Sequence, residues 1–277
     1  MTYVTSEIQR RNRVFRELKR YSWLAYRKIW QIAHNYHRES VPVFIVGSGR
    51  AGTDLLLGHL SWSLSVQTYN EANKRAFKNW RLRPLEEIEL LIQKSFARTV
   101  LFKPIVETYR AAELLRKFDG AKVVFIARHY ADAIESIARF FENLQSTLEI
   151  WAESAMNDPL PPNVSTSTRR MFDRLYRKNL SQKEAAALYW IVYNNSYSAL
   201  NLRKNKCVLL TFYEDLVQST QEEFERVCNF IGAPYSSRMK RGIVTTSIRK
   251  RDNLELRDEI QEQCEDVWQR LIMQRTR

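Results

Sequence analysis

The chain has 277 residues, 44% of them hydrophobic, and a formal net charge of +13, which indicates a globular protein with a substantial core and an anionic ligand, nucleic acid or an acidic membrane surface as partner. Three widely spaced cysteines exclude a disulfide framework or a zinc knuckle, so we expect reduced thiols in a cytoplasmic protein. No stretch approaches the roughly 18 apolar residues of a membrane-spanning helix, and the N-terminus lacks the pattern of a signal peptide.

The first 40 residues are expected to form a basic helical extension. Residues 7–38 combine the apolar periodicity of a helix with many Arg and Lys side chains. We expect this helix to pack on the domain, and contact with a membrane surface or a partner protein is the alternative. Nucleic acid is not an expected partner, because no motif interleaves aromatic and basic residues on a strand.

Five strand-like runs follow, and most are separated by stretches with helical periodicity. Strands that alternate with helices predict an α/β fold, here a P-loop-type parallel sheet of about five strands flanked by helices in three layers, α/β/α. Between the fourth and fifth runs, Ser181 and Glu184 have the capping-box pattern of a helix start. The runs cover residues 43–46, 66–69, 100–103, 123–127 and 208–212.

The stretch "VFIVGSGRAGTDLLLGHL", residues 43–60, changes from a strand through a glycine-rich turn to an apolar helix. Such a turn points backbone N–H groups and the positive end of a helix at one spot, which suits phosphate or sulfate. Gly47 and Gly52 have the spacing of a nucleotide-binding phosphate loop, but Thr53 and Asp54 stand where that loop needs Lys and a hydroxyl residue. A P-loop kinase or hydrolase is therefore disfavoured, and Arg50 supplies the positive charge instead.

A second anion contact is predicted at the end of the fourth strand. There "VVFIARHYADAIESIARF" places Arg128 at the carboxyl edge of the sheet and Ser136 eight residues later, on the next helix. A guanidinium can hold a phosphate through two hydrogen bonds, and a hydroxyl can reach the same anion. The alternative is that Arg128 pairs with a carboxylate and that Ser136 is an ordinary helix residue.

With these motifs the sequence resembles the sulfotransferases that use 3'-phosphoadenosine 5'-phosphosulfate (PAPS). "GSGRAGTDLLL" is similar to their 5'-phosphosulfate loop, "RHYADAIES" to their 3'-phosphate element, and "LLTFYEDLVQSTQEEFERVCNFIGAP" to their strand-YEDL-helix block. The resemblance covers roughly residues 41–252 and is closest to the branch with tyrosylprotein and many bacterial sulfotransferases. It implies one domain over residues 1–277, with a helical insertion at 141–205 and a C-terminal helix at 253–277. It also implies transfer of a sulfuryl group from PAPS to a hydroxyl or amine, with adenosine 3',5'-bisphosphate (PAP) as the product and no metal.

The resemblance implies a set of donor-binding residues. The loop would hold the 5'-phosphosulfate, Arg128 and Ser136 the 3'-phosphate, Tyr213 the adenine, and the late loop "TTSIRKRDN" would add further contacts. One departure is Asp54, which replaces a hydroxyl residue of the family and, because it would repel a phosphosulfate, is expected to turn outward in the first turn of its helix. The full set is Gly49, Arg50, Ala51, Gly52, Thr53, Asp54, Arg128, Ser136, Tyr213, Ser247, Lys250 and Arg251.

Sulfuryl transfer requires a nucleophilic acceptor, an in-line approach to sulfur and positive charge near the oxygens that gain charge. Glu71 follows the second strand at its carboxyl edge and matches the glutamate base of this branch. Lys103 ends the third strand and matches a family lysine expected to stabilise the transferring group. Glu107 is the alternative base, and His59 is expected to be a packing residue.

The sequence leaves the acceptor open. By the resemblance, the insertion at 141–205 shapes the acceptor site, but we expect most of its aromatic side chains in the core. A small molecule from bacterial or cyanobacterial natural-product biosynthesis, for example a saxitoxin-like guanidinium alkaloid, is the first candidate. A carbohydrate or protein tyrosine, and a degenerate PAPS-binding module without turnover, are the alternatives. The aromatic residues are Trp151, Tyr189, Trp190, Tyr193 and Tyr197.

Overall fold

The computed structural model describes residues 21–35, 39–153, 165–246, 248 and 254–275. In this part of the chain, five parallel strands form one sheet in the order β2-β5-β1-β6-β7. Each coincides with one of the five runs predicted from the sequence, so the parallel α/β sheet is confirmed. The strands are β1 (Val41–Gly47), β2 (Val66–Tyr69), β5 (Thr99–Phe102), β6 (Lys122–Ala127) and β7 (Val208–Phe212).

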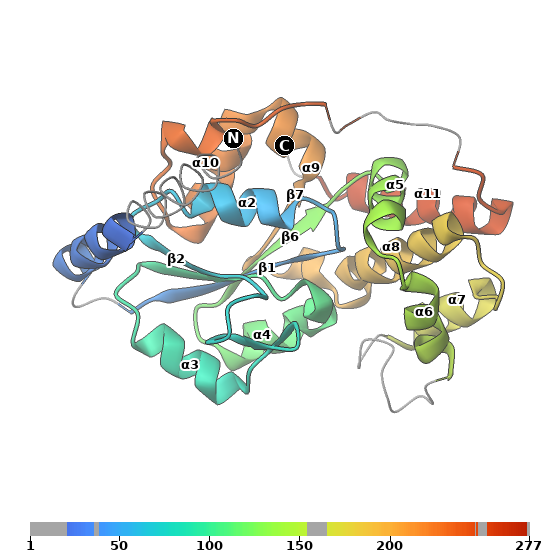
Figure 1. Cartoon of the computed structure of the whole chain (residues 1–277), viewed down its shortest axis with the longest axis horizontal. Coiled ribbons are helices and arrows are strands. Elements are labelled where there is room, and N and C mark those ends of the chain that lie inside the picture. The colour runs from blue at the N-terminus through green and yellow to red at the C-terminus, as the bar shows by residue number, and fades with distance from the viewer. Residues whose placement is uncertain (1–20, 36–38, 154–164, 247, 249–253, 276–277) are drawn as a thin grey trace, which may run out of the picture.

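Helices cover both faces of the sheet and give the three predicted layers (Figure 1). Side chains of β1 alternate between the two cores: Phe44 and Val46 belong to one, and Val43 and Ile45 to the other. The second core contains apolar residues of α2 (Thr53–Leu60), α9 (Tyr213–Gln218) and α10 (Thr220–Ile231). The first contains those of α3 (Leu85–Gln93) and α4 (Ala111–Lys117).

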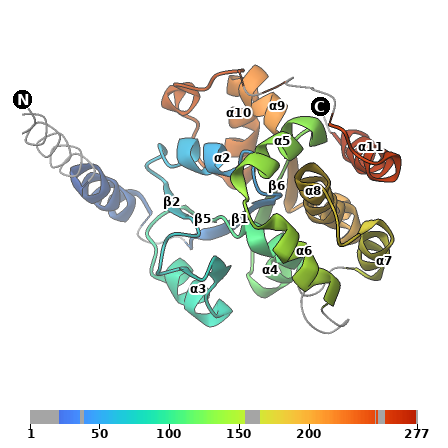
Figure 2. The ribbon, with the colours of Figure 1, turned by 45° about the vertical axis from the view of Figure 1, so that its right-hand side comes forward.

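A group of helices extends the first core beyond the β7 side of the sheet (Figures 1 and 2). Its centre is α8 (Gln182–Ala199), which begins with the predicted capping box of Ser181 and Glu184. Because α8 is buried along almost its whole length, it can pack against several helices at once. The others are α5 (Tyr130–Phe140), α6 (Leu144–Glu153), α7 (Thr166–Leu175) and α11 (Asp258–Ile272).

The helix at residues 21–35 lies beside β2, the edge strand of the sheet (Figure 2). Gln31 Nε2 donates a hydrogen bond to the carbonyl of Leu64 at 2.8 Å, just before β2 begins. The described part of the N-terminal extension therefore packs on the edge of the domain at β2. The short elements are the hairpin β3 (Phe77–Lys78) and β4 (Arg81–Leu82), and the 3-10 helices η1 (Ile105–Arg110), η2 (Leu202–Lys204) and η3 (Ser237–Lys240).

Cys207, Cys228 and Cys264 are free thiols, the first exposed and the other two buried. Of the helices described, none combines the length and the apolar character that crossing a membrane requires.

Candidate active site

The loop between β1 and α2 has the strand-turn-helix form predicted for an anion site. Gly52 has φ +100°, and a Cβ atom there would lie only 2.3 Å from Cδ2 of Tyr213. Gly47 has φ +145°, and its amide donates to the Thr108 hydroxyl at 3.0 Å. Both positions therefore need glycine, one to bring the loop against the Tyr213 ring and the other to leave the strand. The first turn of α2 follows at Thr53.

Arg50 connects this loop to the element predicted to hold a second phosphate. Its Nε donates to Ser136 Oγ at 3.1 Å, and its guanidinium lies 4.5 Å from the centre of the Phe140 ring. Arg128 Nη1 donates to the Arg50 carbonyl at 3.0 Å, and the Arg128 guanidinium lies 4.5 Å from the centre of the Tyr213 ring. The three residues named for the two ends of the donor, Arg50, Arg128 and Ser136, thus come together, because β1 and β6 are neighbours in the sheet.

Glu71, Lys103 and Asp54 form a charged cluster beside the loop. Glu71 follows β2 and Lys103 follows β5, and these adjacent parallel strands end at the same edge. Lys103 Nζ lies 2.7 Å from Glu71 Oε2 and 2.7 Å from Asp54 Oδ1. The Glu71 and Lys103 side chains are 3% and 4% exposed, whereas that of Asp54 is 75% exposed. The expectation that Asp54 turns outward is wrong, because the attraction of Lys103 brings it to the site.

The Glu71 carboxyl is prepared for proton transfer. Burial raises its pKa above the ordinary 4.5, and the ion pair with Lys103 offsets this only in part. Oε2 is held by Lys103, while the buried Oε1 has no hydrogen-bond partner among the described residues. The carboxyl therefore has one oxygen in an ion pair and one buried oxygen that no group in the described part of the chain satisfies.

A cavity of about 860 Å³ contains most of the predicted site. Ser136 contributes through its bond to Arg50, and Ala51 is buried in the core between the sheet and α2. Ser247, Lys250 and Arg251 lie outside the described residues. The predicted residues that line the cavity are Gly49, Arg50, Gly52, Thr53, Asp54, Glu71, Lys103, Arg128 and Tyr213.

The two alternative base residues lie elsewhere. Glu107 is buried, and it accepts hydrogen bonds from the Leu82 amide at 2.6 Å and from Arg110 at 2.7 Å. Both of its oxygens are thus engaged: Oε2 holds η1 to the β3–β4 hairpin, and Oε1 pairs with Arg110 within η1. His59 packs against Phe224 with 5.8 Å between the ring centres, as expected of a packing residue.

Aromatic residues of the insertion contribute more to the cavity than the sequence suggested. All five residues of this set are buried in the core, as expected, and three of them, Trp151, Tyr189 and Tyr193, also line the cavity. Tyr189 and Tyr193 are four residues apart on α8 and therefore share one face, a spacing that could have linked them. Trp80, in the β3–β4 hairpin, also lines the cavity, and sequence reasoning missed it.

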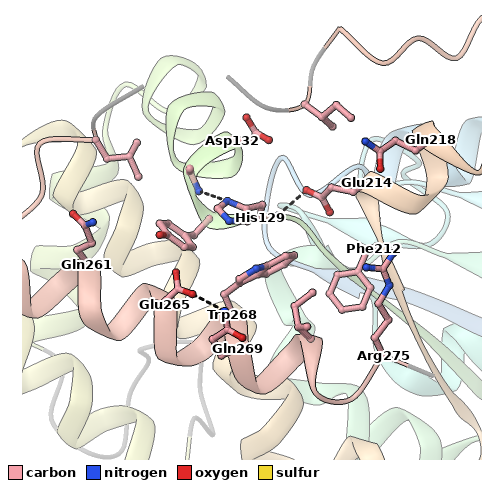
Figure 3. Close-up of a pocket in the computed structure, with 15 residues that line it drawn as sticks. His129, Asp132, Phe212, Glu214, Gln218, Gln261, Glu265, Trp268, Gln269 and Arg275 are labelled. Atoms are coloured by element: carbon pink, nitrogen blue, oxygen red, sulfur yellow. Dashed lines mark hydrogen bonds between the residues drawn. The ribbon is translucent and has the colours of Figure 1, made fainter. Parts of the chain in front are cut away.

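A second cavity, of about 840 Å³, lies between the start of α5, α9 and α11 (Figure 3). Three acidic side chains line it, those of Asp132, Glu214 and Glu265. Glu214 accepts a hydrogen bond from the His129 amide at 2.9 Å, and burial raises its pKa. The acidic lining does not suit an anion, so the cavity with Arg50, Lys103 and Arg128 is the better site for one.

A family model described as "Sulfotransferase domain" matches residues 41–276. Among solved structures, the sulfotransferase domain from the curacin biosynthetic pathway is 15% identical, with 83% of this chain and 98% of that chain covered and a TM-score of 0.50. A sulfotransferase from Alicyclobacillus acidocaldarius is also 15% identical, over 84% and 92% of the two chains, with a TM-score of 0.47. A mouse sulfotransferase complexed with PAP is 13% identical, over 84% and 85%, with a TM-score of 0.43. The first of these likenesses supports a common fold. Among curated proteins no significant match is found.

Proposed function

Because this chain belongs to the sulfotransferase family, we propose that it transfers a sulfuryl group from PAPS to a hydroxyl or amine of a small-molecule acceptor. The observation that carries the proposal is the buried Glu71–Lys103 pair, which lines one cavity together with the glycine-rich loop and two arginines. A base, a positive charge and an anion-binding loop are the parts that sulfuryl transfer needs.

The residues present fit the proposed donor. Backbone N–H groups of the loop, Arg50 and the start of α2 at Thr53 would hold the 5'-phosphosulfate. Arg128 and Ser136, both bonded to Arg50, would hold the 3'-phosphate. Tyr213, which Gly52 approaches closely, would contact the adenine. When bound, PAPS supplies an activated sulfuryl group and leaves as PAP.

Glu71 would act as the general base. Its Oε1 would accept the proton of the acceptor hydroxyl, while Lys103 holds Oε2 in the ion pair. Because the Glu71 pKa is raised, the carboxylate is a stronger base than an ordinary glutamate. Lys103 would place its ammonium charge next to the oxygens that gain charge during transfer.

Asp54 gives Lys103 a second partner on the loop side. Since its side chain is 75% exposed, this ion pair is weak and can open when an anion enters the loop. The pair would then hold Lys103 in place before the donor binds. A cytoplasmic setting and an acceptor from natural-product biosynthesis belong to the same proposal, and the free thiols support the first of these.

The test is to incubate the full chain with PAPS and a panel of hydroxyl and amine compounds, and to measure the release of PAP. Release that depends on both the acceptor and Glu71 supports the proposal. Tight PAP binding with no release from any acceptor would instead favour a binding module without turnover.

A further inference from the structure

Apart from the charged and loop residues, the cavity is lined mainly by apolar and aromatic side chains. We call this part of its wall the acceptor wall. It contains residues from the β3–β4 hairpin, η1, the junction of α5 with α6, α6 itself, and α8. Six of its members are Trp80, Ile105, Phe141, Trp151, Tyr189 and Tyr193.

Both tyrosine hydroxyls of this wall are engaged within the protein. The Tyr193 hydroxyl donates to the Val106 carbonyl at 3.4 Å, and the Tyr189 hydroxyl interacts with Tyr193 and with the Gly49 backbone. Arg81 Nη1, which also reaches the cavity, donates to the Tyr109 hydroxyl at 2.9 Å. The wall therefore presents mostly ring faces and aliphatic carbon to a ligand.

Apart from the other N–H groups of Arg81, few groups remain to bind polar atoms of an acceptor. Asn79 and Thr147 add two short polar side chains, and both carboxylates, those of Asp54 and Glu71, already pair with Lys103. A carbohydrate would bury several hydroxyls without partners, which is costly. A guanidinium would compete with Lys103 for the only carboxylates that line the cavity in the described part of the chain. These two acceptor classes are therefore disfavoured.

The Trp80 ring is held at the cavity by a strained turn. Asn79 and Trp80 form the two-residue loop of the β3–β4 hairpin with φ +52° and +66°, in positions where glycine or asparagine is preferred. Trp80 is nevertheless 66% exposed while it lines the cavity. A large exposed ring on a strained backbone is typical of a residue kept for contact with a ligand.

On the basis of the proposed sulfuryl transfer, we infer that the acceptor is an uncharged hydroxyl compound with a hydrophobic, ring-containing skeleton, and that Trp80 is a specificity-determining contact for it. The ring system packs on the acceptor wall, and the hydroxyl points to Glu71. In the reaction the acceptor oxygen forms a bond to sulfur, and the bond from sulfur to the phosphate oxygen of PAPS breaks. The electron pair of that bond leaves with PAP, and the hydroxyl proton goes to Glu71 Oε1.

The first experiment compares acceptors that differ in polarity. We would measure kcat/KM of the full chain, with PAPS saturating, for 2-naphthol, glucosamine and agmatine. The expected result is a kcat/KM at least about tenfold higher for 2-naphthol than for the other two. A preference for the sugar or the guanidinium compound, or PAP binding with no turnover of 2-naphthol, would overturn the inference. Failure of the parent protein to bind PAP would overturn the proposed function itself.

The second experiment tests Trp80 with Trp80→Gly, which removes the ring and relieves the backbone strain. Trp62→Ala is the control, because Trp62 is also exposed but packs on Trp23 rather than in the cavity. We expect Trp80→Gly to raise the KM for 2-naphthol about tenfold, with an unchanged Kd for PAP and a melting temperature no lower than that of the parent. The control should leave the KM unchanged. If the KM of Trp80→Gly for 2-naphthol is unchanged, Trp80 does not contact the acceptor. If Trp80→Gly has a lower melting temperature and the Trp62→Ala control raises the KM by the same factor, Trp80 has only a structural role.

Discussion

The Glu71→Gln variant tests the proposed base most sharply. The amide keeps the size of the side chain but cannot take a proton at Oε1. General-base catalysis contributes about 10²- to 10⁴-fold in rate, which corresponds to about 3–5 kcal/mol of transition-state stabilisation. We therefore expect kcat to fall by about that factor. PAP affinity should change little, because Lys103 keeps its contact of 2.7 Å with Asp54.

Stability should respond differently from turnover. Because burial raises the folded-state pKa of Glu71, protonation of the folded protein is favoured. The stabilisation from this shift is complete below the unfolded-state pKa, near 4.5, and is lost as pH rises through the raised folded-state value. At neutral pH the charged Glu71 thus contributes a burial cost that the amide lacks. We expect the melting temperature of Glu71→Gln to stay close to that of the parent.

The assay is the initial rate of PAP release at saturating PAPS and acceptor, as a function of pH. In the parent, kcat should rise with pH, with an acid limb centred above 4.5 because the base must lose its proton. The limb should be absent in Glu71→Gln. Glu107→Gln is the matched control: its kcat should be unchanged, while its melting temperature falls because the amide keeps one acceptor oxygen for the two donors, Leu82 and Arg110. Turnover of Glu71→Gln within a few-fold of the parent, with the same acid limb, would refute the assignment.

Three further substitutions test the loop and its neighbours. Gly52→Ala should destabilise the fold by about 1–3 kcal/mol in denaturation, because residue 52 has a positive φ and its new Cβ would meet the Tyr213 ring. Gly58→Ala has open space around it and should instead stabilise α2 by about 0.5–1 kcal/mol. Equal effects of the two substitutions would show that Gly52 is not required by the loop. Asp54→Ser should tighten PAPS binding by up to about fivefold in calorimetry, because an exposed ion pair contributes at most about 1 kcal/mol, and weaker binding would show that Asp54 helps to hold the donor. Arg128→Lys should weaken PAP binding by about 10- to 100-fold, because a hydrogen bond to a charged group contributes about 1.5–3 kcal/mol. ADP, which has no 3'-phosphate, should bind both proteins equally. Equal losses of affinity for PAP and ADP would argue against a 3'-phosphate contact.

The parts of the site that follow from strand order could be predicted from the sequence. Arg50, Glu71, Lys103 and Arg128 each stand just after a strand, and parallel strands end at one edge of a sheet. Their convergence therefore required only the correct strands. The capping box at Ser181 was predictable for a different reason: its pattern depends only on residues close together in the sequence.

Other features depend on contacts that no local pattern encodes. The direction of Asp54 is set by Lys103, which lies far along the chain and reaches the loop only once β5 pairs with β1. The β3–β4 hairpin escaped prediction because its turn is Asn79-Trp80 rather than a glycine turn, and its strands are two residues each. The cavity-lining role of Trp151 likewise depends on how α6 packs against α8.

The proposed donor site recognises the 3'-phosphate of a PAPS-type donor. The most direct test is calorimetric titration of the full chain with PAP beside ADP and ATP, each with and without magnesium. We predict tight binding of PAP that does not depend on magnesium, and much weaker binding of ADP and ATP. Absence of PAP binding, or a preference for ATP with magnesium, would contradict the account.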